Sequence, residues 1–83
     1  TQPEGWSSSR EGKAIQRQFL FQDFKQAWVW MSEVAKVTDE RDHHPEWFNV
    51  YNKVDVTLTT HDVGTVSPKD IALAETMNAL YAS

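Results

Sequence analysis

Apolar and polar residues alternate in the segment 14–21. Ile15, Phe19 and Phe21 share one parity, with Arg17 as the exception, while polar Gln16 and Gln18 share the other. This period of two is typical of a strand with one buried face.

Residues 1–12 precede this strand and are rich in serine, glycine and charged side chains. Trp6 is their one large apolar group. We therefore expect a loosely ordered lead-in that is anchored by a single ring.

A spacing of three and four residues predicts a helix over about 21–38. Its expected apolar face consists of Phe24, Ala27, Trp28, Met31, Val34 and Ala35. Asp23 followed by Gln26 is typical of an N-terminal capping box. Val29 and Trp30 lie off the expected face, so we expect them to be partly exposed or to cover a neighbouring subunit.

Two strands, 47–51 and 54–60, are predicted to form a hairpin that turns near residues 52–53. Pro45 disfavours helical dihedral angles in the residue before it, so the preceding helix should end before the His43-His44-Pro45 motif. In the second strand, Val54, Val56 and Leu58 share one face, and Asp55, Thr57, Thr59 and His61 share the other. His61 should therefore leave the sheet on its polar side.

A second helix is predicted to begin after Ser67, with Pro68 in its first position and Asp70 close to the free amide protons. Its apolar face should consist of Ile71, Ala74, Met77 and Leu80 or Tyr81. The expected order is strand-helix-strand-strand-helix. Two helices on one face of an antiparallel sheet would bury both apolar faces, so we predict a single α+β domain over 1–83.

Composition narrows the possible functions. The formal net charge is −4 and the basic residues are scattered, which argues against direct nucleic-acid binding. The longest apolar run, Ala27–Met31, is too short to span a bilayer. The lack of cysteine excludes disulfides and thiol chemistry. Extra stability for a domain this small would have to come from oligomerisation, so we expect a partner subunit.

The three histidines carry the concentrated chemistry of the chain. His43 and His44 follow the first helix, and His61 follows a strand. Nearby acidic residues are Asp39, Glu40, Asp42 and Asp62. Imidazole can give and accept a proton near neutral pH, and a carboxylate can fix its tautomer.

The same residues also allow other interpretations. Each histidine taken alone is more often a surface or capping residue, and Asp70 is more often a helix cap than an acid. Zinc binding by His43, His44 and His61 is disfavoured, because sequential neighbours rarely converge on one ion. We therefore expect no metal.

The chain resembles the pterin-4a-carbinolamine dehydratases through an acidic residue, a His-His-Pro triplet, an aromatic residue, a later histidine and a later aspartate. The matching residues are Asp39, His43-His44-Pro45, Tyr51, His61 and Asp70. The resemblance extends from Gly5-Trp6 into the last helix. One departure is Gly64-Thr65-Val66, where the family usually has Gly-Gly-Leu. We also expect no counterpart in residues 1–83 of the family's extra N-terminal helix.

The resemblance implies that 4a-hydroxytetrahydrobiopterin loses water to give quinonoid dihydrobiopterin, without a cofactor. It assigns catalysis to His43, His44 and His61, with support from Asp39, Pro45 and Asp70. It places Asp42, Thr59, Thr60 and Asp62 around the pterin substrate.

The resemblance also implies a homodimer or homotetramer in the cytoplasm, and in some relatives a nuclear role beside a homeodomain transcription factor. A non-enzymatic oligomerisation or coactivator module is therefore the alternative function.

Overall fold

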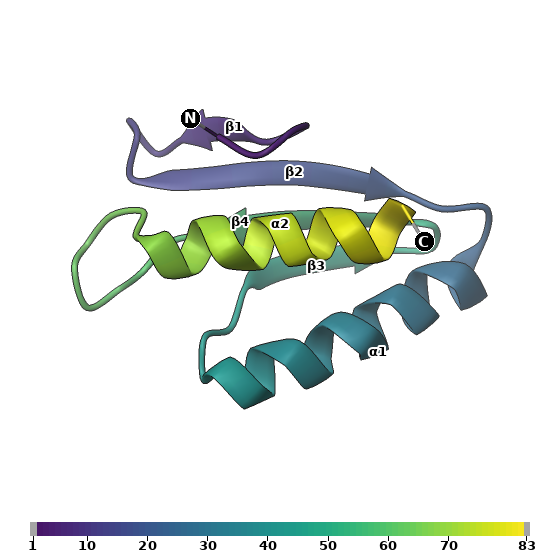
Figure 1. The fold of residues 1–83 in the computed structure, drawn as a ribbon. Coiled ribbons are helices and arrows are strands. Elements are labelled where there is room, and N and C mark those ends of the chain that lie inside the picture. Colours follow the sequence, from purple (N-terminus) through teal and green to yellow (C-terminus); the bar gives the residue numbers. More distant parts are fainter. Residues whose placement is uncertain (1, 83) are drawn as a thin grey trace.

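A four-stranded antiparallel sheet organises the computed structural model, which describes residues 2–82. Its strands are β1 (Ser7–Ser9), β2 (Ala14–Leu20), β3 (Glu46–Val50) and β4 (Lys53–Leu58), in the spatial order β1-β2-β4-β3. The helices are α1 (Phe24–Arg41) and α2 (Pro68–Ala82). Both pack on the same face of the sheet (Figure 1), so the predicted α+β class is confirmed.

Strand β1 corrects one expectation, because it lies in the segment that was predicted to be a loosely ordered lead-in. Ser7 pairs with Gln16 of β2, and Ser9 pairs with Ala14. Trp6 is buried, and its Nε1 donates a hydrogen bond to Oδ1 of Asn78 at 2.9 Å. A run of three serines has no apolar alternation, so only pairing with β2 and the anchored ring reveal this strand.

The side of the sheet that faces the helices carries the predicted apolar residues. Ile15 and Phe19 of β2 and Val54, Val56 and Leu58 of β4 are all buried. Arg17, the exception in the alternation, has its guanidinium carbon 4.5 Å from the centre of the Phe19 ring. Its Nη1 donates to Oδ1 of Asn78 at 2.7 Å, so the charge is accommodated at the edge of the core.

Helix α1 begins directly after the predicted Asp23 cap, but it starts and ends three residues later than the expected range of about 21–38. Oδ1 of Asp23 accepts a hydrogen bond from the Gln26 amide at 2.9 Å. The helix continues to Arg41, and Asp42 then adopts a left-handed conformation with φ of 51°. The His43 amide donates to the Thr38 carbonyl at 3.1 Å, which closes the helix end.

The predicted apolar face of α1 is partly wrong. Trp30 is only 5% exposed and belongs to the core, whereas Phe24 and Trp28 are 46% and 55% exposed. The buried residues of α1 are Ala27, Trp30, Met31, Val34 and Thr38. They follow the same spacing of three and four, so periodicity alone could not choose between the two faces.

Contacts made by the Trp30 ring account for this choice. The ring lies 4.4 Å from the Phe19 ring and 5.3 Å from the Phe21 ring, measured between centres. Its Nε1 also donates to the Met77 carbonyl at 3.3 Å, which joins α1 to α2. Burial of Trp30 therefore satisfies its polar atom as well as its apolar surface.

Helix α2 begins at Pro68 and buries Leu73, Ala74 and Met77 against the sheet and α1. The expected face is confirmed at Ala74 and Met77, and Leu73 is an additional core residue. Neither helix in the described range 2–82 has the length and apolarity that a bilayer crossing requires.

Candidate active site

Three connections lie at one end of the sheet and bring the predicted site residues to the same part of the molecule. They are the β1–β2 turn, the α1–β3 connection and the β4–α2 loop, all on the left in Figure 1. The α1–β3 connection carries His43 and His44, and the β4–α2 loop carries His61. The fold thus gathers all three histidines at this end.

His43 is the inward-facing member of the pair. The left-handed turn at Asp42 redirects the chain after α1, and the His43 side chain is only 11% exposed. Its Nε2 lies 2.6 Å from Oδ1 of Asp70. This short contact with a carboxylate fixes the ring and favours a proton on Nε2.

Asp70 has no exposed surface, and both oxygens of its carboxylate have polar partners. Besides His43, it accepts hydrogen bonds through Oδ2 from the Thr60 hydroxyl at 2.7 Å and from the Ser67 amide at 2.9 Å. The Ser67 amide is at the N-terminus of α2, where a negative charge is stabilised. A buried carboxylate needs such partners, because an unpaired one would be costly.

Thr60 joins the two histidine-bearing segments. Its hydroxyl donates to Asp70, and it lies 2.6 Å from the Ser67 hydroxyl, which must then donate to Thr60. Thr60 directly precedes His61 in the chain. The position of the His61 segment is therefore tied to the Asp70 carboxylate that holds His43.

His44 and His61 are exposed and lie beside other carboxylates. Nε2 of His44 is 3.9 Å from Oδ1 of Asp39, which itself is largely exposed. His61 has 81% of its side chain exposed, and its Nε2 lies 3.4 Å from Oε2 of Glu46. Each histidine thus has its own acidic neighbour.

Glu46 and Arg10 are site residues that the sequence did not reveal. Arg10 donates to both carboxylate oxygens of Glu46, at 3.1 Å and 2.5 Å. These hydrogen bonds lower the pKa of Glu46 below its ordinary range, although partial desolvation opposes the shift. Glu46 follows the His-His-Pro motif directly, which was the available signal; nothing in the sequence pointed to Arg10.

The remaining predicted residues take other positions. The Thr59 hydroxyl donates to the Lys13 carbonyl at 2.7 Å, and so closes the sheet end. Within residues 2–82, the side chains of Asp42 and Asp62 form no hydrogen bond or ion pair. Pro45 is half-buried and leads into β3. Contacts with a pterin for Asp42, Thr59, Thr60 and Asp62 stay predictions.

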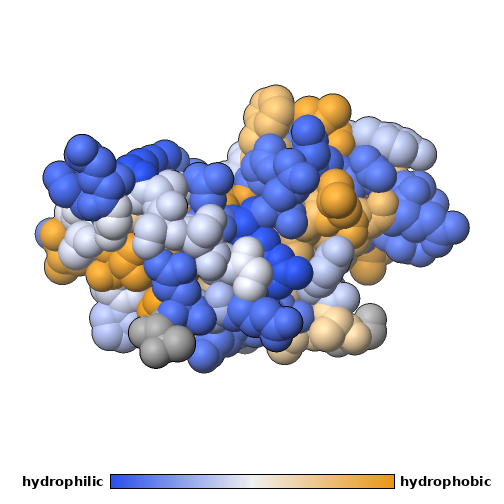
Figure 2. Space-filling view, turned by 90° about the horizontal axis from the view of Figure 1, so that it is seen from above, coloured by the Kyte–Doolittle hydropathy of each residue, from blue (hydrophilic) through white to orange (hydrophobic). Residues whose placement is uncertain are grey.

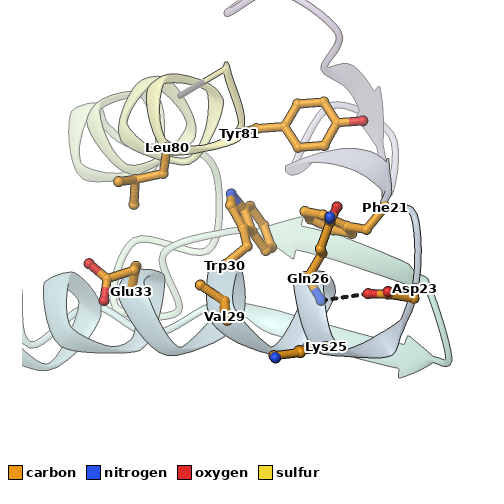
Figure 3. A pocket seen from close by; sticks show the side chains of 9 residues that line it. All are labelled: Phe21, Asp23, Lys25, Gln26, Val29, Trp30, Glu33, Leu80 and Tyr81. Carbon is orange, nitrogen blue, oxygen red and sulfur yellow. Dashed lines mark hydrogen bonds between the residues drawn. The ribbon is translucent and has the colours of Figure 1, made fainter.

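Two hollows are found on residues 2–82, and neither contains all three histidines. The larger, of about 720 Å³, is a groove between α1 and α2 at the opposite end of the helices. Figure 3 shows Phe21, Trp30, Leu80 and Tyr81 along it, with charged groups at its rim. A hollow of about 360 Å³ lies beside His43, Arg41, Lys69 and Ala72, and neither His44 nor His61 lines it. Of the three histidines, only His43 therefore lines either of these two hollows.

The predicted exclusion of zinc can be compared with the geometry. Over residues 2–82, no three histidine or carboxylate side chains come close enough together to form a metal-binding group. The histidines are directed to separate carboxylates instead of to one point. Whether the protein uses a metal stays a prediction.

Known proteins resemble this chain over most of its length. The family model of pterin 4 alpha carbinolamine dehydratase matches residues 1–80. A Rhodopseudomonas palustris protein, named "Putative pterin-4-alpha-carbinolamine dehydratase", is 51% identical over 94% of this chain and 77% of its own. A Bradyrhizobium protein of the same name is 53% identical over 95% of this chain and 80% of its own.

Solved structures with the same fold are also similar to this chain. A Brucella melitensis protein, described as a transcriptional coactivator/pterin dehydratase, is 46% identical, with a TM-score of 0.91 over 94% of this chain and 83% of its own. A pterin dehydratase-like RuBisCO assembly factor of the alpha-carboxysome is 20% identical, with a TM-score of 0.82 over 96% of this chain and 93% of its own. The latter likeness shows the fold alone. The family match and these close relatives show that the chain belongs to the pterin-4a-carbinolamine dehydratase family.

Proposed function

We propose that the chain catalyses the dehydration of 4a-hydroxytetrahydrobiopterin to quinonoid dihydrobiopterin and water. In this reaction the C4a–O bond breaks and the leaving hydroxyl takes up a proton. N5 loses its proton, and its electron pair forms the new bond to C4a. One general acid and one general base balance the reaction, so the proposal calls for no metal or redox cofactor.

The observation that carries this proposal is the His43–Asp70 contact of 2.6 Å. A base becomes an imidazolium when it takes the N5 proton, and the buried Asp70 carboxylate would stabilise that charge. Asp70 holds Nε2, so Nδ1 is the nitrogen that can meet the substrate. We assign His43 the role of the base on these grounds.

His61 or His44 would then supply the proton to the leaving hydroxyl. Both are exposed at the same end of the sheet, where a planar pterin ring can approach from solvent. His61 is our choice for the acid, because Thr60 ties its segment to the Asp70 carboxylate. Recycling of the pterin of aromatic amino acid hydroxylases follows as the proposed physiological role.

A direct assay tests the proposal. Freshly generated 4a-hydroxytetrahydrobiopterin is mixed with catalytic amounts of the protein, and formation of the quinonoid product is followed by absorbance. We expect His61→Ala to slow dehydration by about 100-fold, which is within the usual contribution of a positioned acid. The matched control is His44→Ala, which should cost less, and an undiminished rate in folded His61→Ala would refute the assignment.

A second candidate function is a non-enzymatic interaction module. Phe24, Trp28 and Val29 are exposed on α1, and the rings of Phe24 and Trp28 stack at 6.2 Å. Exposed apolar groups also interrupt the mostly hydrophilic surface in Figure 2. Such groups commonly mark an interface, either with a second copy or with a partner protein.

Turnover and partner binding separate the two functions, and oligomer size tests the exposed side of α1. Sedimentation of the wild type against Trp28→Ser tests whether this side of α1 holds a homodimer or homotetramer together. A transcription-factor pull-down that works equally well with wild type and histidine variants, without turnover by either, would favour the module over the enzyme.

A further inference from the structure

We propose that Glu46 is a positioning residue for His61, and that Arg10 holds Glu46 in the conformation in which it does so. This inference rests on the proposed dehydration, since it assigns a role to a neighbour of the proposed acid. It concerns Arg10 of the β1–β2 turn and Glu46 at the start of β3, which meet on the open side of the sheet. Neither belongs to the family motif in the sequence.

The geometry places Glu46 between a cation and an imidazole. Glu46 begins β3 on the side of the sheet that the helices leave open, opposite Thr57 of β4. Both of its oxygens accept hydrogen bonds from Arg10, and Oε2 also lies 3.4 Å from Nε2 of His61. A bidentate arginine contact restricts a carboxylate in both position and orientation.

Arg10 is itself fixed by an unusual turn. Arg10 and Glu11 have φ values of 52° and 59°, and Gly12 follows with 85°. The Lys13 amide donates to the Arg10 carbonyl at 3.2 Å, and the Gly12 amide donates to the Ser9 carbonyl at 3.1 Å. Two consecutive non-glycine residues with positive φ are uncommon, and such backbone conformations concentrate at functional sites.

Stability alone does not account for this cluster. Exposed ion pairs contribute little to folding, and Arg10, Glu46 and His61 are all substantially exposed. An exposed imidazole on a loop, by contrast, samples several rotamers unless a neighbour restricts it. Glu46 can supply that restriction at Nε2 and so leave Nδ1 of His61 directed to a substrate.

The contact between Glu46 and His61 resembles the buried contact between Asp70 and His43. Asp70 contacts Nε2 of His43, and Glu46 contacts Nε2 of His61. Each carboxylate is in turn held by other donors, which are Thr60 and the Ser67 amide for Asp70 and Arg10 for Glu46. In both histidines the carboxylate contact is therefore made by Nε2, and Nδ1 is the nitrogen left for a substrate.

Kinetics of Glu46→Gln test the inference. We expect kcat for dehydration to fall about tenfold with little change in KM, because the substrate still binds but meets a less ordered acid. Glu46→Asp should recover part of the loss. Glu33→Gln is the matched control, because Glu33 forms an exposed ion pair with Lys36 on α1, away from the histidines. This variant should leave kcat unchanged.

A double variant separates positioning from a general structural effect. If Glu46 acts through His61, then Glu46→Gln should cause no further loss of rate in a His61→Ala background. An equal fractional loss in both backgrounds would overturn the inference. Arg10→Met removes the contact to Glu46 without a substitution in β3. It should also reduce the dehydration rate, but by less than Glu46→Gln.

A measurement without turnover keeps this inference distinct from the proposed function. Two-bond ¹H–¹⁵N spectra report which nitrogen of each neutral imidazole carries the proton. In Glu46→Gln the two ring nitrogen shifts of His61 should move toward each other, while those of His44 stay in place. Unchanged His61 shifts would overturn the positioning role, whereas absent turnover with the expected shift would overturn only the proposed reaction.

Discussion

Asp70 shows how one buried side chain can organise a site. Its carboxylate receives contacts from His43 in the α1–β3 connection and from Thr60 and the Ser67 amide at the two ends of the β4–α2 loop. Sequence spacing predicted the cap at the start of α2 and, through the family resemblance, a supporting role. It could not predict complete burial, which depends on how α2 packs beside the end of α1.

Replacement of Asp70 should therefore reduce stability as well as activity. Asp70→Ala leaves the Thr60 hydroxyl and the Ser67 amide without their acceptor, and we expect the free energy of unfolding to fall by about 3 kcal/mol. Urea denaturation followed by tryptophan fluorescence measures this change. Asp62→Ala is the exposed control, and equal unfolding midpoints for the two variants would contradict the role given to Asp70.

Glu46 leads to a prediction about acid stability. Arg10 lowers the pKa of Glu46, so the ionised carboxylate favours the folded state above the ordinary carboxyl range near about pH 4. This contribution is lost as the pH falls through the lowered pKa. Because the pair is exposed, we expect less than about 1 kcal/mol.

Comparison of the wild type with Glu46→Gln tests whether ionised Glu46 stabilises the folded state. Urea midpoints measured from pH 6 down to pH 3 should fall more steeply for the wild type, and the difference should shrink in high salt. A wild type and variant that lose stability in parallel over this range would show that the Arg10–Glu46 pair has no such effect.

At the scale of elements, α1 shows both what a sequence pattern determines and what it leaves open. The helix, its Asp23 cap and its end before the His-His-Pro motif were all predictable from local rules. Its buried face was not, because Phe24 and Trp28 satisfy the same spacing as Ala27 and Trp30. Packing of the Trp30 ring on Phe19 resolves the ambiguity. This contact joins a helix to a strand, so the periodicity of α1 alone does not show it.

Two tryptophans of this helix provide an internal test. Trp30→Ala removes a buried ring and should cost about 3–5 kcal/mol of unfolding free energy. Trp28→Ala removes an exposed ring and should change stability by no more than about 0.5 kcal/mol in the isolated subunit. Thermal and urea unfolding of dilute protein would contradict this assignment if Trp28→Ala proved the more damaging change.

Strand β1 and the contact between Arg10 and Glu46 could not be predicted from local sequence patterns. Serine-rich strands lack an apolar period, and the turn that presents Arg10 depends on three successive left-handed residues. Both features arise from pairing between segments. The alternation in β2 and β4, by contrast, was sufficient to predict which sides face the helices.

At the scale of the whole molecule, the fold separates two regions. One end of the sheet collects the histidines and their carboxylates, while the groove between the helices opens at the other end. The sequence alone placed the histidines together only through the family resemblance. The topology supplies the physical reason, since three connections return to the same sheet end.

The most direct test of the central claim is the dehydration rate of His43→Ala with freshly formed 4a-hydroxytetrahydrobiopterin, measured beside the wild type in the presence of a chelator. The account predicts full activity of the wild type with chelator and a loss of about 100-fold or more in His43→Ala. A folded His43→Ala protein that dehydrates the substrate as fast as the wild type would contradict it.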